Sequence, residues 1–358
     1  MNQAPDPNPP SASGRSPVKM PIPRTESATA PRAPRPGANG AVRTRARDPL
    51  TKLLDRQHGV LSREQAAAFG IATSTITYRV KPGGPWQRIL PRVYLTGRST
   101  PTVDQLDMAA LLYAGNRSLL TGRAALRRVG IWPAATGIVD VLVPATSRPA
   151  TRDYVRVHRT ARLPRMYLQE GSINFTMIPR AITDAALAAG SVRDTRAIVC
   201  IGVDRGCTLD ELAAELGTSR LANSARLRAV LGDVARGIRS GPEGDLMDLI
   251  DKSGLPEPVY NPRLYVGGIF LASPDAWWEK FGVAAEVDSR EYHYDEADWE
   301  HTMQRHARMT AAGIAVLHFT PRRIRTQPAQ VIAIIRDTLR HGGPIAGVRT
   351  VPFVQPGS

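Results

Sequence analysis

Two acidic residues in the C-terminal third of the chain have a spacing that suits metal chemistry. In the segment Ser273–His293, SPDAWWEKFGVAAEVDSREYH, the carboxylates of Glu286 and Asp288 are two residues apart. If Phe281–Ser289 is a strand, both side chains leave the same face, about 6–7 Å apart. Like charges this close repel each other, so the pair is costly unless a cation or a proton lies between them.

A third carboxylate, Asp275, follows the apolar run Ile269–Ala272. Hard divalent ions prefer such oxygen clusters, and Mg²⁺ in particular binds through one or two carboxylates together with a phosphate. The stretch therefore predicts a metal-dependent phosphodiester site with Mg²⁺ or Mn²⁺ as cofactor. Acid pairs one residue apart also occur on the solvated faces of edge strands, and spacing alone leaves that alternative open.

A fourth acid, Glu243, lies in the segment GPEGDLMDLIDKSGL, where Leu246 and Ile250 follow at i+3 and i+7. This spacing puts Glu243 on the apolar stripe of a helix, where a carboxylate is expensive unless it serves a site. The Val/Ala face of the later strand favours a central position in a sheet, where an exposed acidic face is less expected. Both observations favour a functional site over a solvated surface.

Several short pieces carry a family resemblance: Pro242-Glu243, Ser273-Pro274-Asp275, Glu286-Val287-Asp288 with Tyr292-His293, and Ala312–Leu317. Through them, residues from about 240 to 340 resemble the DUF559 domains, relatives of the very-short-patch-repair endonucleases in the PD-(D/E)XK superfamily. The resemblance implies that Asp275 and Glu286 are metal ligands and that Glu243 is a supporting acid. Asp288 then stands where the wider superfamily usually has its lysine. Two departures are Ser289 in place of a glycine and the absence of an acid around Arg305.

Two basic side chains complete the predicted catalytic site. Trp299–Ala312 is predicted as a helix, in which His301 and Arg305 share a face because they are four residues apart. If that face looks into the site, Arg305 would stabilise charge developing on a phosphate, and His293 would carry a proton. A solvated helix charge and a packing histidine are the alternatives.

From Asp48 on, the pattern is that of short helices followed by a hairpin. Ser62-Arg63-Glu64-Gln65 is a capping box that starts a helix, and Gly70 ends it. A further helix is predicted at Ser74–Val80, and Trp86–Leu95 alternates apolar and polar side chains like a hairpin. This order predicts a winged helix-turn-helix. Its contacts with double-stranded DNA would come from the last helix in the major groove and from the hairpin on phosphates, through Thr73, Ser74, Thr77, Tyr78, Arg79, Lys81, Arg88 and Arg92.

Two pieces of this region, HGVLSREQAAAFGIATSTITYRV and GPWQRILPRVYLTG, resemble the N-terminal domain of AbiEi-type antitoxins. That family is associated with DNA binding and autorepression in type IV toxin–antitoxin systems, so the resemblance implies a cognate toxin as a further partner. A winged helix used for protein contact is the alternative.

The bulk properties agree with an anionic partner. The chain has 358 residues, a net charge of +15 and a pI near 10.5, which favours nucleic acid over a membrane surface. Without a membrane-length apolar run or a signal peptide, we expect a cytoplasmic protein with no membrane partner. The two cysteines, Cys200 and Cys207, indicate neither a disulfide framework nor a zinc site. No GxxxxGK[ST] or HExxH motif occurs, so neither a nucleotide cofactor nor zinc-protease chemistry is expected.

The predicted organisation is multidomain, combining α+β and α/β parts. It consists of a disordered Pro/Arg-rich tail (1–48), a winged helix-turn-helix (49–98), an α+β, AbiEi-like middle region (99–239), a restriction-endonuclease-like mixed sheet flanked by helices (240–342) and a tail (343–358). Two functions remain open: a Mg²⁺-dependent DNA endonuclease, and an antitoxin-type DNA-binding regulator whose nuclease-like domain is an inactive scaffold. The set of four acids favours the first, and Asp288 in place of lysine favours the second.

Overall fold

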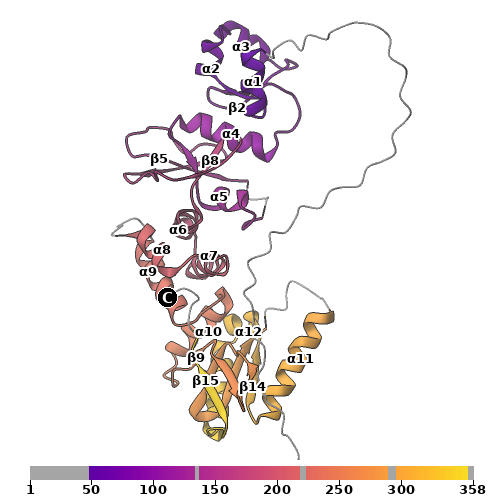
Figure 1. The fold of residues 1–358 in the computed structure, drawn as a ribbon, viewed down its shortest axis with the longest axis vertical. Coiled ribbons are helices and arrows are strands. Elements are labelled where there is room, and N and C mark those ends of the chain that lie inside the picture. The colour runs from indigo at the N-terminus through magenta and orange to yellow at the C-terminus, as the bar shows by residue number, and fades with distance from the viewer. Residues whose placement is uncertain (1–47, 134–136, 218–222, 289–295, 354–358) are drawn as a thin grey trace, which may run out of the picture. The chain divides into compact units, whose positions relative to one another are not determined.

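The structure, a computed structural model, describes residues 48–133, 137–217, 223–288 and 296–353, with the backbone alone for 296–302. This part of the chain has mixed α+β content, with thirteen α-helices and four sheets (Figure 1). Apart from Asp48, the predicted tail 1–48 lies outside the described residues. No helix in the described ranges combines the length and apolarity that a membrane span requires.

The first elements place three helices against a small antiparallel sheet. They are α1 (Pro49–Arg56), β1 (Val60–Ser62), α2 (Arg63–Ala68), α3 (Thr73–Arg79), β2 (Gln87–Leu90) and β3 (Val93–Leu95). The predicted capping box is present, because Ser62 Oγ accepts from the Gln65 N–H and Gln65 Oε1 accepts from the Ser62 N–H. β3 lies between β1 and β2, and the core beneath contains Leu61, Ile76 and Trp86. The sequence had not indicated β1.

A five-stranded mixed sheet follows, in the order β6-β5-β4-β8-β7. Its elements are α4 (Val103–Ala114), β4 (Leu119–Leu120), α5 (Gly122–Arg128), β5 (Val139–Pro144), β6 (Val155–Thr160), β7 (Leu168–Glu170) and β8 (Ile173–Phe175). β5 is buried because α4 and α5 both pack on it, and β6, which runs parallel to β5, is an edge strand. One edge of β6 is therefore unpaired in this sheet.

Four helices continue the chain: α6 (Ile178–Ala188), α7 (Val192–Asp204), α8 (Leu209–Leu216) and α9 (Ser224–Ala235). A second capping box, formed by Thr208 and Glu211, starts α8. On α7, the buried Arg196 donates to Asp233 of α9 and to Asp248 on the next helix, at 2.8 and 2.6 Å. This ion triad ties α7 and α9 to the C-terminal elements.

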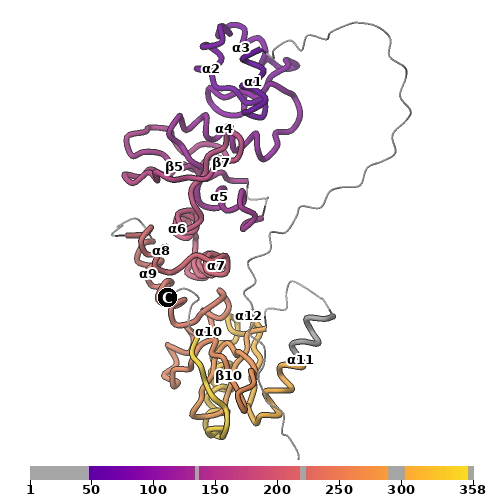
Figure 2. The backbone as a smooth tube through the Cα atoms, in the orientation of Figure 1, coloured from indigo at the N-terminus to yellow at the C-terminus, as the bar shows by residue number. Residues whose placement is uncertain are grey.

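Two further sheets form the C-terminal region. The elements are α10 (Gly241–Asp251), β9 (Val259–Tyr260), β10 (Arg263–Val266), β11 (Ile269–Ala272), β12 (Ala276–Trp278), the 3-10 helix η1 (Glu279–Phe281), β13 (Val283–Val287), α11 (Glu296–Ala311), β14 (Ala315–Phe319), α12 (Pro321–Thr326), α13 (Pro328–His341) and β15 (Val348–Val351). The strand orders are β14-β13-β12-β9 and β11-β10-β15, and only β13 and β14 pair in parallel. The backbone trace in Figure 2 follows these connections.

The side chains of β13 alternate between two apolar layers, as the sequence predicts. Val283 and Ala285 pack with α10, α12 and α13, whereas Ala284 packs with Met309 of α11. The strand is shorter than expected, because Phe281 belongs to η1 and Asp288 follows the last strand residue. The segment 343–358, predicted as a tail, contains β15, which pairs with β10.

Candidate functional site

Two of the predicted acids face each other across the β12–β13 pair. Ala276 pairs with Ala285, so continuing the antiparallel register by one residue puts Asp275 opposite Glu286. Directly opposed residues of an antiparallel pair project from the same face. Asp275 Oδ2 also accepts a hydrogen bond from the Val287 N–H, at 2.6 Å. The residue that leads into β12 is thereby fixed beside the strand that carries Glu286.

Glu286 is buried, with 2% of its surface exposed. Its Oε2 accepts a hydrogen bond from Arg305 Nη2 of α11 at 3.1 Å, whereas Oε1 has no hydrogen-bond partner among the described residues. Burial raises the pKa of Glu286 to about 7, although Arg305 and His318 act to lower it. A buried carboxylate oxygen without a donor is costly when charged, so this atom is suited to a cation or a proton.

The other two acids contribute to the same electrostatic cluster. Burial raises the pKa of Asp275 well above its usual range, and the carboxylates of Glu243 and Glu286 raise it further. Asp288 and Glu243 likewise act to raise the pKa of Glu286. The structure therefore brings Glu243 and Glu286 within electrostatic range of Asp275, and Glu243 and Asp288 within electrostatic range of Glu286. Groups coupled in this way titrate together, and one of them tends to hold a proton near neutral pH.

Glu243 also has a structural role at the start of α10, which its spacing in the sequence does not indicate. It is the third residue of α10, its N–H donates to Ser240 Oγ at 3.3 Å, and its Oε2 accepts from the Arg239 N–H at 2.9 Å. The same oxygen accepts from Asn261 Nδ2 at 2.7 Å. These bonds cap α10 and fix the carboxylate, so its place on the helix does not by itself require a functional site.

Two polar residues of the cluster were not predicted, His318 and Asn261. His318 of β14 pairs with Glu286 in the parallel register, its Nδ1 lies 3.1 Å from Asp288 Oδ2, and its ring centroid lies 4.8 Å from that of His306. The sequence signal available was the largely apolar stretch 314–319, whose parallel pairing with β13 as a strand aligns His318 with Glu286. His293 lies outside the described residues.

The acidic cluster offers some, but not all, of the oxygen ligands that a bound Mg²⁺ ion needs. The described residues hold no group of three or more His, Cys, Asp and Glu side chains placed to bind a metal ion together. One oxygen of Asp275 and one of Glu286 are already engaged, by the Val287 N–H and Arg305. Two carboxylates with a substrate phosphate are nevertheless a common Mg²⁺ arrangement, and Glu286 Oε1 remains to ligate. The donor set suits an ion completed by substrate more than one held by protein alone.

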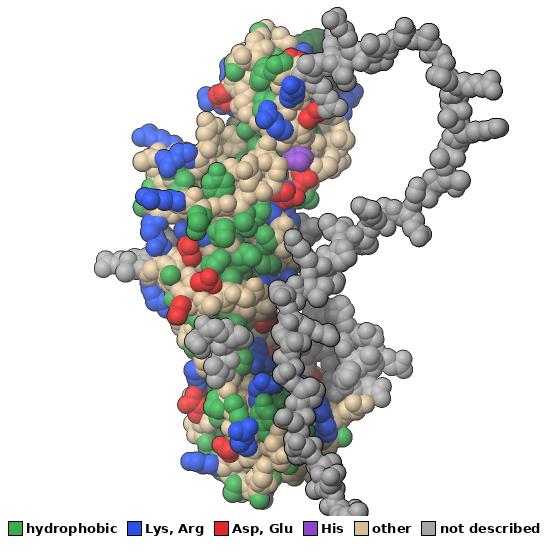
Figure 3. Space-filling model, in the orientation of Figure 1, with side chains coloured by type: hydrophobic (Ala, Val, Ile, Leu, Met, Phe, Trp, Pro, Cys, Tyr) green, Lys and Arg blue, Asp and Glu red, His purple; other side chains and the backbone are tan. Residues whose placement is uncertain are grey.

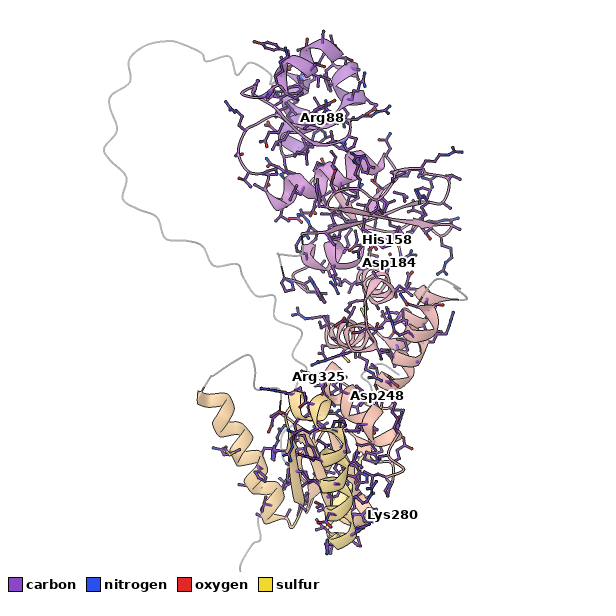
Figure 4. The ribbon with its side chains drawn as sticks, turned by 180° about the vertical axis from the view of Figure 1, so that it is seen from behind. Arg88, His158, Asp184, Asp248, Lys280 and Arg325 are labelled. Carbon is purple, nitrogen blue, oxygen red and sulfur yellow. The ribbon has the colours of Figure 1, made fainter. Side chains whose placement is uncertain are left out.

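The predicted DNA contacts lie on α3 and on the β2–β3 hairpin. Those that are exposed are Thr73, Ser74, Thr77, Tyr78, Lys81, Arg88 and Arg92. The Tyr78 side chain is 70% exposed, and the Lys81 ammonium lies 5.7 Å from its ring centroid. Arg79 differs from the others, because its half-buried guanidinium stacks on Trp86 at 4.7 Å. Arg88, labelled in Figure 4, projects from β2.

Arg92 lies at the hairpin tip in a left-handed conformation, with φ at +63°, and its guanidinium is 3.7 Å from Glu64. Its carbonyl accepts from the Arg63 N–H, which links the hairpin to the start of α2. Arg79 and Arg92 therefore have structural partners, whereas the hydroxyl groups, Tyr78, Lys81 and Arg88 form the exposed polar surface.

No protein-family model and no curated protein matches this sequence. Among solved structures, the chain is similar to the RV2827C protein from Mycobacterium tuberculosis, with a TM-score of 0.35 and 14% sequence identity. The match covers 51% of this chain and 79% of that chain. At this TM-score the two folds are not shown to be the same.

Proposed function

We propose that this protein binds double-stranded DNA and hydrolyses phosphodiester bonds with the help of Mg²⁺ or Mn²⁺. One observation carries the proposal: the coupled carboxylates of Asp275 and Glu286, opposed across two strands, with Glu286 buried and its Oε1 unpartnered among the described residues. A buried acid pair with raised pKa values is typical of sites that bind cations or move protons. We place this site in a restriction-endonuclease-like fold, supported by the β14-β13-β12-β9 sheet between α11 and the helices α10 and α13.

DNA would be held by a winged helix-turn-helix formed by α1 to β3. The element order, with β3 between β1 and β2 and an exposed polar α3, supports this assignment. Tyr78 and Lys81 would contact the major groove, and Arg88 would contact phosphates. The net charge of +15 makes binding to a polyanion favourable before any specific contact forms.

In the proposed reaction, Asp275 and Glu286 would ligate the metal ion. When bound, such an ion activates water and neutralises charge on the phosphate. Arg305, which holds Glu286 Oε2 at 3.1 Å, orients that carboxylate and places a positive charge beside the phosphate. Glu243, fixed by Asn261 and the Arg239 N–H, keeps negative charge near Asp275 and so favours cation binding.

A plasmid assay tests the enzyme. Supercoiled DNA is incubated with the full chain and 5–10 mM Mg²⁺ or Mn²⁺, beside Glu286→Gln and Asp275→Asn, at about pH 8. We expect metal-dependent nicking that falls at least a hundredfold in both variants. The matched control is Asp337→Asn, an exposed acid on α13, which should keep wild-type activity. Cleavage that survives in Glu286→Gln would rule out the proposed site.

An antitoxin-type DNA-binding regulator with an inactive nuclease-like scaffold is the second candidate. It is favoured by the pairing of Glu286 with Arg305 and by the lack of a three-group metal site among the described residues. A regulator of this type would have a cognate toxin as a further partner. The two candidates separate cleanly, because the regulator shifts DNA in a gel with no cleavage by any divalent ion.

A further inference from the structure

The strand β6 and its flanking loops form the most basic stretch in the middle of the chain. Between residues 148 and 165 the sequence has six arginines and a single acid, Asp153. Five of the six arginines are exposed, namely Arg148, Arg152, Arg159, Arg162 and Arg165. Figure 3 shows Lys and Arg side chains gathered along the edge of the region that contains β5 and β6. Neither of the functions proposed above uses this surface.

A groove of about 540 Å³ runs between β6 and α6 in this region. Its walls include Arg156, His158 and Arg159 from the strand and Arg180 and Asp184 from the helix. A neighbouring hollow of about 260 Å³ shares Arg159, Arg180 and Asp184 and adds Arg162. Figure 4 labels His158 and Asp184, which lie close together where the strand faces the helix. The two hollows therefore adjoin each other along the strand–helix junction.

The acids of this groove already have partners. Asp184 accepts from Arg180 Nε at 2.9 Å and from Thr121 Oγ1 at 2.5 Å. Glu215, which lines the smaller hollow, lies 3.7 Å from Arg180 Nη1. Asp140 of the adjacent strand β5 lies 2.8 Å from His158 Nε2 and 3.8 Å from Arg156 Nη1. Because each carboxylate is compensated within the groove, the remaining arginines give the surface a net positive charge. An incoming anion would meet these arginines before it meets an unpaired acid.

Arg159 and Arg162 are held in a way that preserves their charge. Arg159 donates to the carbonyls of Ser147 and Pro149, at 3.1 and 2.8 Å, and Arg162 donates to the carbonyl of Glu215. In the described ranges neither guanidinium forms an ion pair with a carboxylate. A carbonyl fixes the position of a guanidinium without neutralising it, and each guanidinium has five N–H donors, so several remain for another acceptor. Both groups are thus pre-positioned cations.

We propose that this groove binds the phosphate backbone of duplex DNA, with Arg159 and Arg162 as the principal contacts and Arg156 as a third. A chain of phosphates suits the surface better than a single nucleotide, because the basic residues extend along the strand and both flanking loops. The groove would then supply sequence-independent affinity, while α3 supplies base contacts. This inference rests on the proposed DNA binding and adds a second DNA-contacting surface to it.

The salt dependence of DNA binding tests the groove. Fluorescence anisotropy with a labelled 30-base-pair duplex, from 50 to 300 mM KCl, compares the full-length chain with the double variant Arg159→Gln/Arg162→Gln. The matched control is Arg336→Gln/Arg340→Gln, which removes the same charge from the exposed face of α13. Each phosphate contact contributes about 0.9 to the slope of log K against log salt, so we expect the groove variant to lose about 1.8 and the control almost nothing.

A charge-preserving double variant and a single variant show whether a change in slope comes from the lost charge or from a disturbed fold. Arg159→Lys/Arg162→Lys should keep a slope near that of the wild type. Arg156→Gln, whose guanidinium lies 3.8 Å from Asp140, should lose about 0.9. A slope that falls equally in the groove and control variants, or in neither, overturns the proposal. So does a loss confined to duplex RNA of the same sequence, because the groove would then serve RNA.

The two proposals fail in different ways. If the wild-type chain does not bind duplex DNA at 50 mM KCl, both the proposed function and the groove are rejected. If Tyr78→Ala/Lys81→Ala weakens binding while Arg159→Gln/Arg162→Gln leaves the slope unchanged, the winged helix stands and the groove alone is rejected.

Discussion

Asp107 of α4 and Glu286 of β13 are buried to a similar extent, but the charges of their neighbouring side chains differ. Asp107 is fully buried and faces two arginines of α5, with Oδ1 at 2.5 Å from Arg127 and Oδ2 at 3.4 Å from Arg128. Arg128 is shared further with Asp104 and with Glu170 of β7. Glu286 has one arginine, Arg305, which is 36% exposed, and its other charged neighbours include Asp288 and Glu243. The first cluster is compensated and the second carries surplus negative charge.

This difference teaches how to separate structural from functional buried charge. Burial raises the pKa of both Asp107 and Glu286, so burial alone does not distinguish them. Around both acids the next largest effects lower the pKa, through Arg127 and Arg128 at Asp107 and through Arg305 and His318 at Glu286. The clusters differ at Asp275, whose pKa is raised further by the carboxylates of Glu243 and Glu286. A folded protein has no structural reason to hold uncompensated like charges together, so such a cluster favours a function that brings in a cation.

The largest expected effect comes from breaking the compensated cluster. Asp107→Asn leaves Arg127 and Arg128, which are 9% and 8% exposed, facing a neutral amide. Removing one partner of a buried ion pair costs roughly 3–5 kcal/mol, so we expect a loss of this size. Urea unfolding followed by circular dichroism measures it. If Asp107→Asn is as stable as the wild type, the cluster is not holding α4 to α5, and the comparison with Glu286 fails.

The elements that could be predicted from sequence are those formed by interactions between residues close together in the chain. The start of α2 was predicted because its capping box is complete within four residues, at Ser62–Gln65, and α8 begins with the same kind of local signal at Thr208–Glu211. The short strands β1, β4, β9 and β12 were not predicted, because two or three residues show no periodicity. β15 forms only through its pairing with β10, more than eighty residues earlier.

The candidate site divides in the same way. Glu286, Asp288 and Asp275 were predicted from spacing within one segment, and Arg305 from the helix period. His318 was not, because strand pairing brings it to Glu286 across thirty-two residues. Asn261 was missed for a similar reason, since its hydrogen bond to Glu243 joins a turn after β9 to the start of α10. The sequence thus indicated the acids and Arg305, but not His318 and Asn261, which contact them through long-range pairing.

Replacing Glu286 is expected to increase the stability of the folded protein, by less than Asp107→Asn decreases it. An unfolded glutamate titrates near 4.5 and the folded Glu286 near 7, so between these pH values the native state binds more protons and its stability falls as pH rises. Glu286→Gln removes this penalty. In EDTA at pH 8 the variant should be roughly 1–3 kcal/mol more stable than the wild type, and the gain should vanish by about pH 4.5.

Urea unfolding at pH 4.5 and pH 8 measures this gain, with tryptophan fluorescence as a probe because Trp277 and Trp278 lie on the neighbouring strand. Asp337→Asn on the exposed face of α13 is the control and should change stability by less than about 0.5 kcal/mol at either pH. A Glu286→Gln variant that is less stable at pH 8 would show that Arg305 compensates the carboxylate fully, as the arginines do for Asp107.

Adding the proposed cation sharpens the contrast between the clusters. Mg²⁺ at ten times its dissociation constant should stabilise the wild type by about 1.4 kcal/mol, because it binds the native state alone. Glu286→Gln should gain little, whereas Asp107→Asn should gain as much as the wild type despite its lower stability. Thermal unfolding with and without Mg²⁺ at pH 8 measures the three shifts. An equal gain in Glu286→Gln would put the bound ion elsewhere.

The smallest effect is expected where charge is compensated but exposed. Arg236 pairs with Asp251 at 3.2 Å and with Glu257 at 2.7 Å, and these side chains are 36%, 41% and 68% exposed. Solvent screens such pairs, so Asp251→Asn should cost less than about 1 kcal/mol, and 0.5 M salt should reduce the cost further. The cost of Asp107→Asn should persist in the same salt, because water does not reach that pair. If the two substitutions cost the same, pairing rather than burial sets the energy of these clusters, and the buried, underpaired Glu286 would no longer be exceptional.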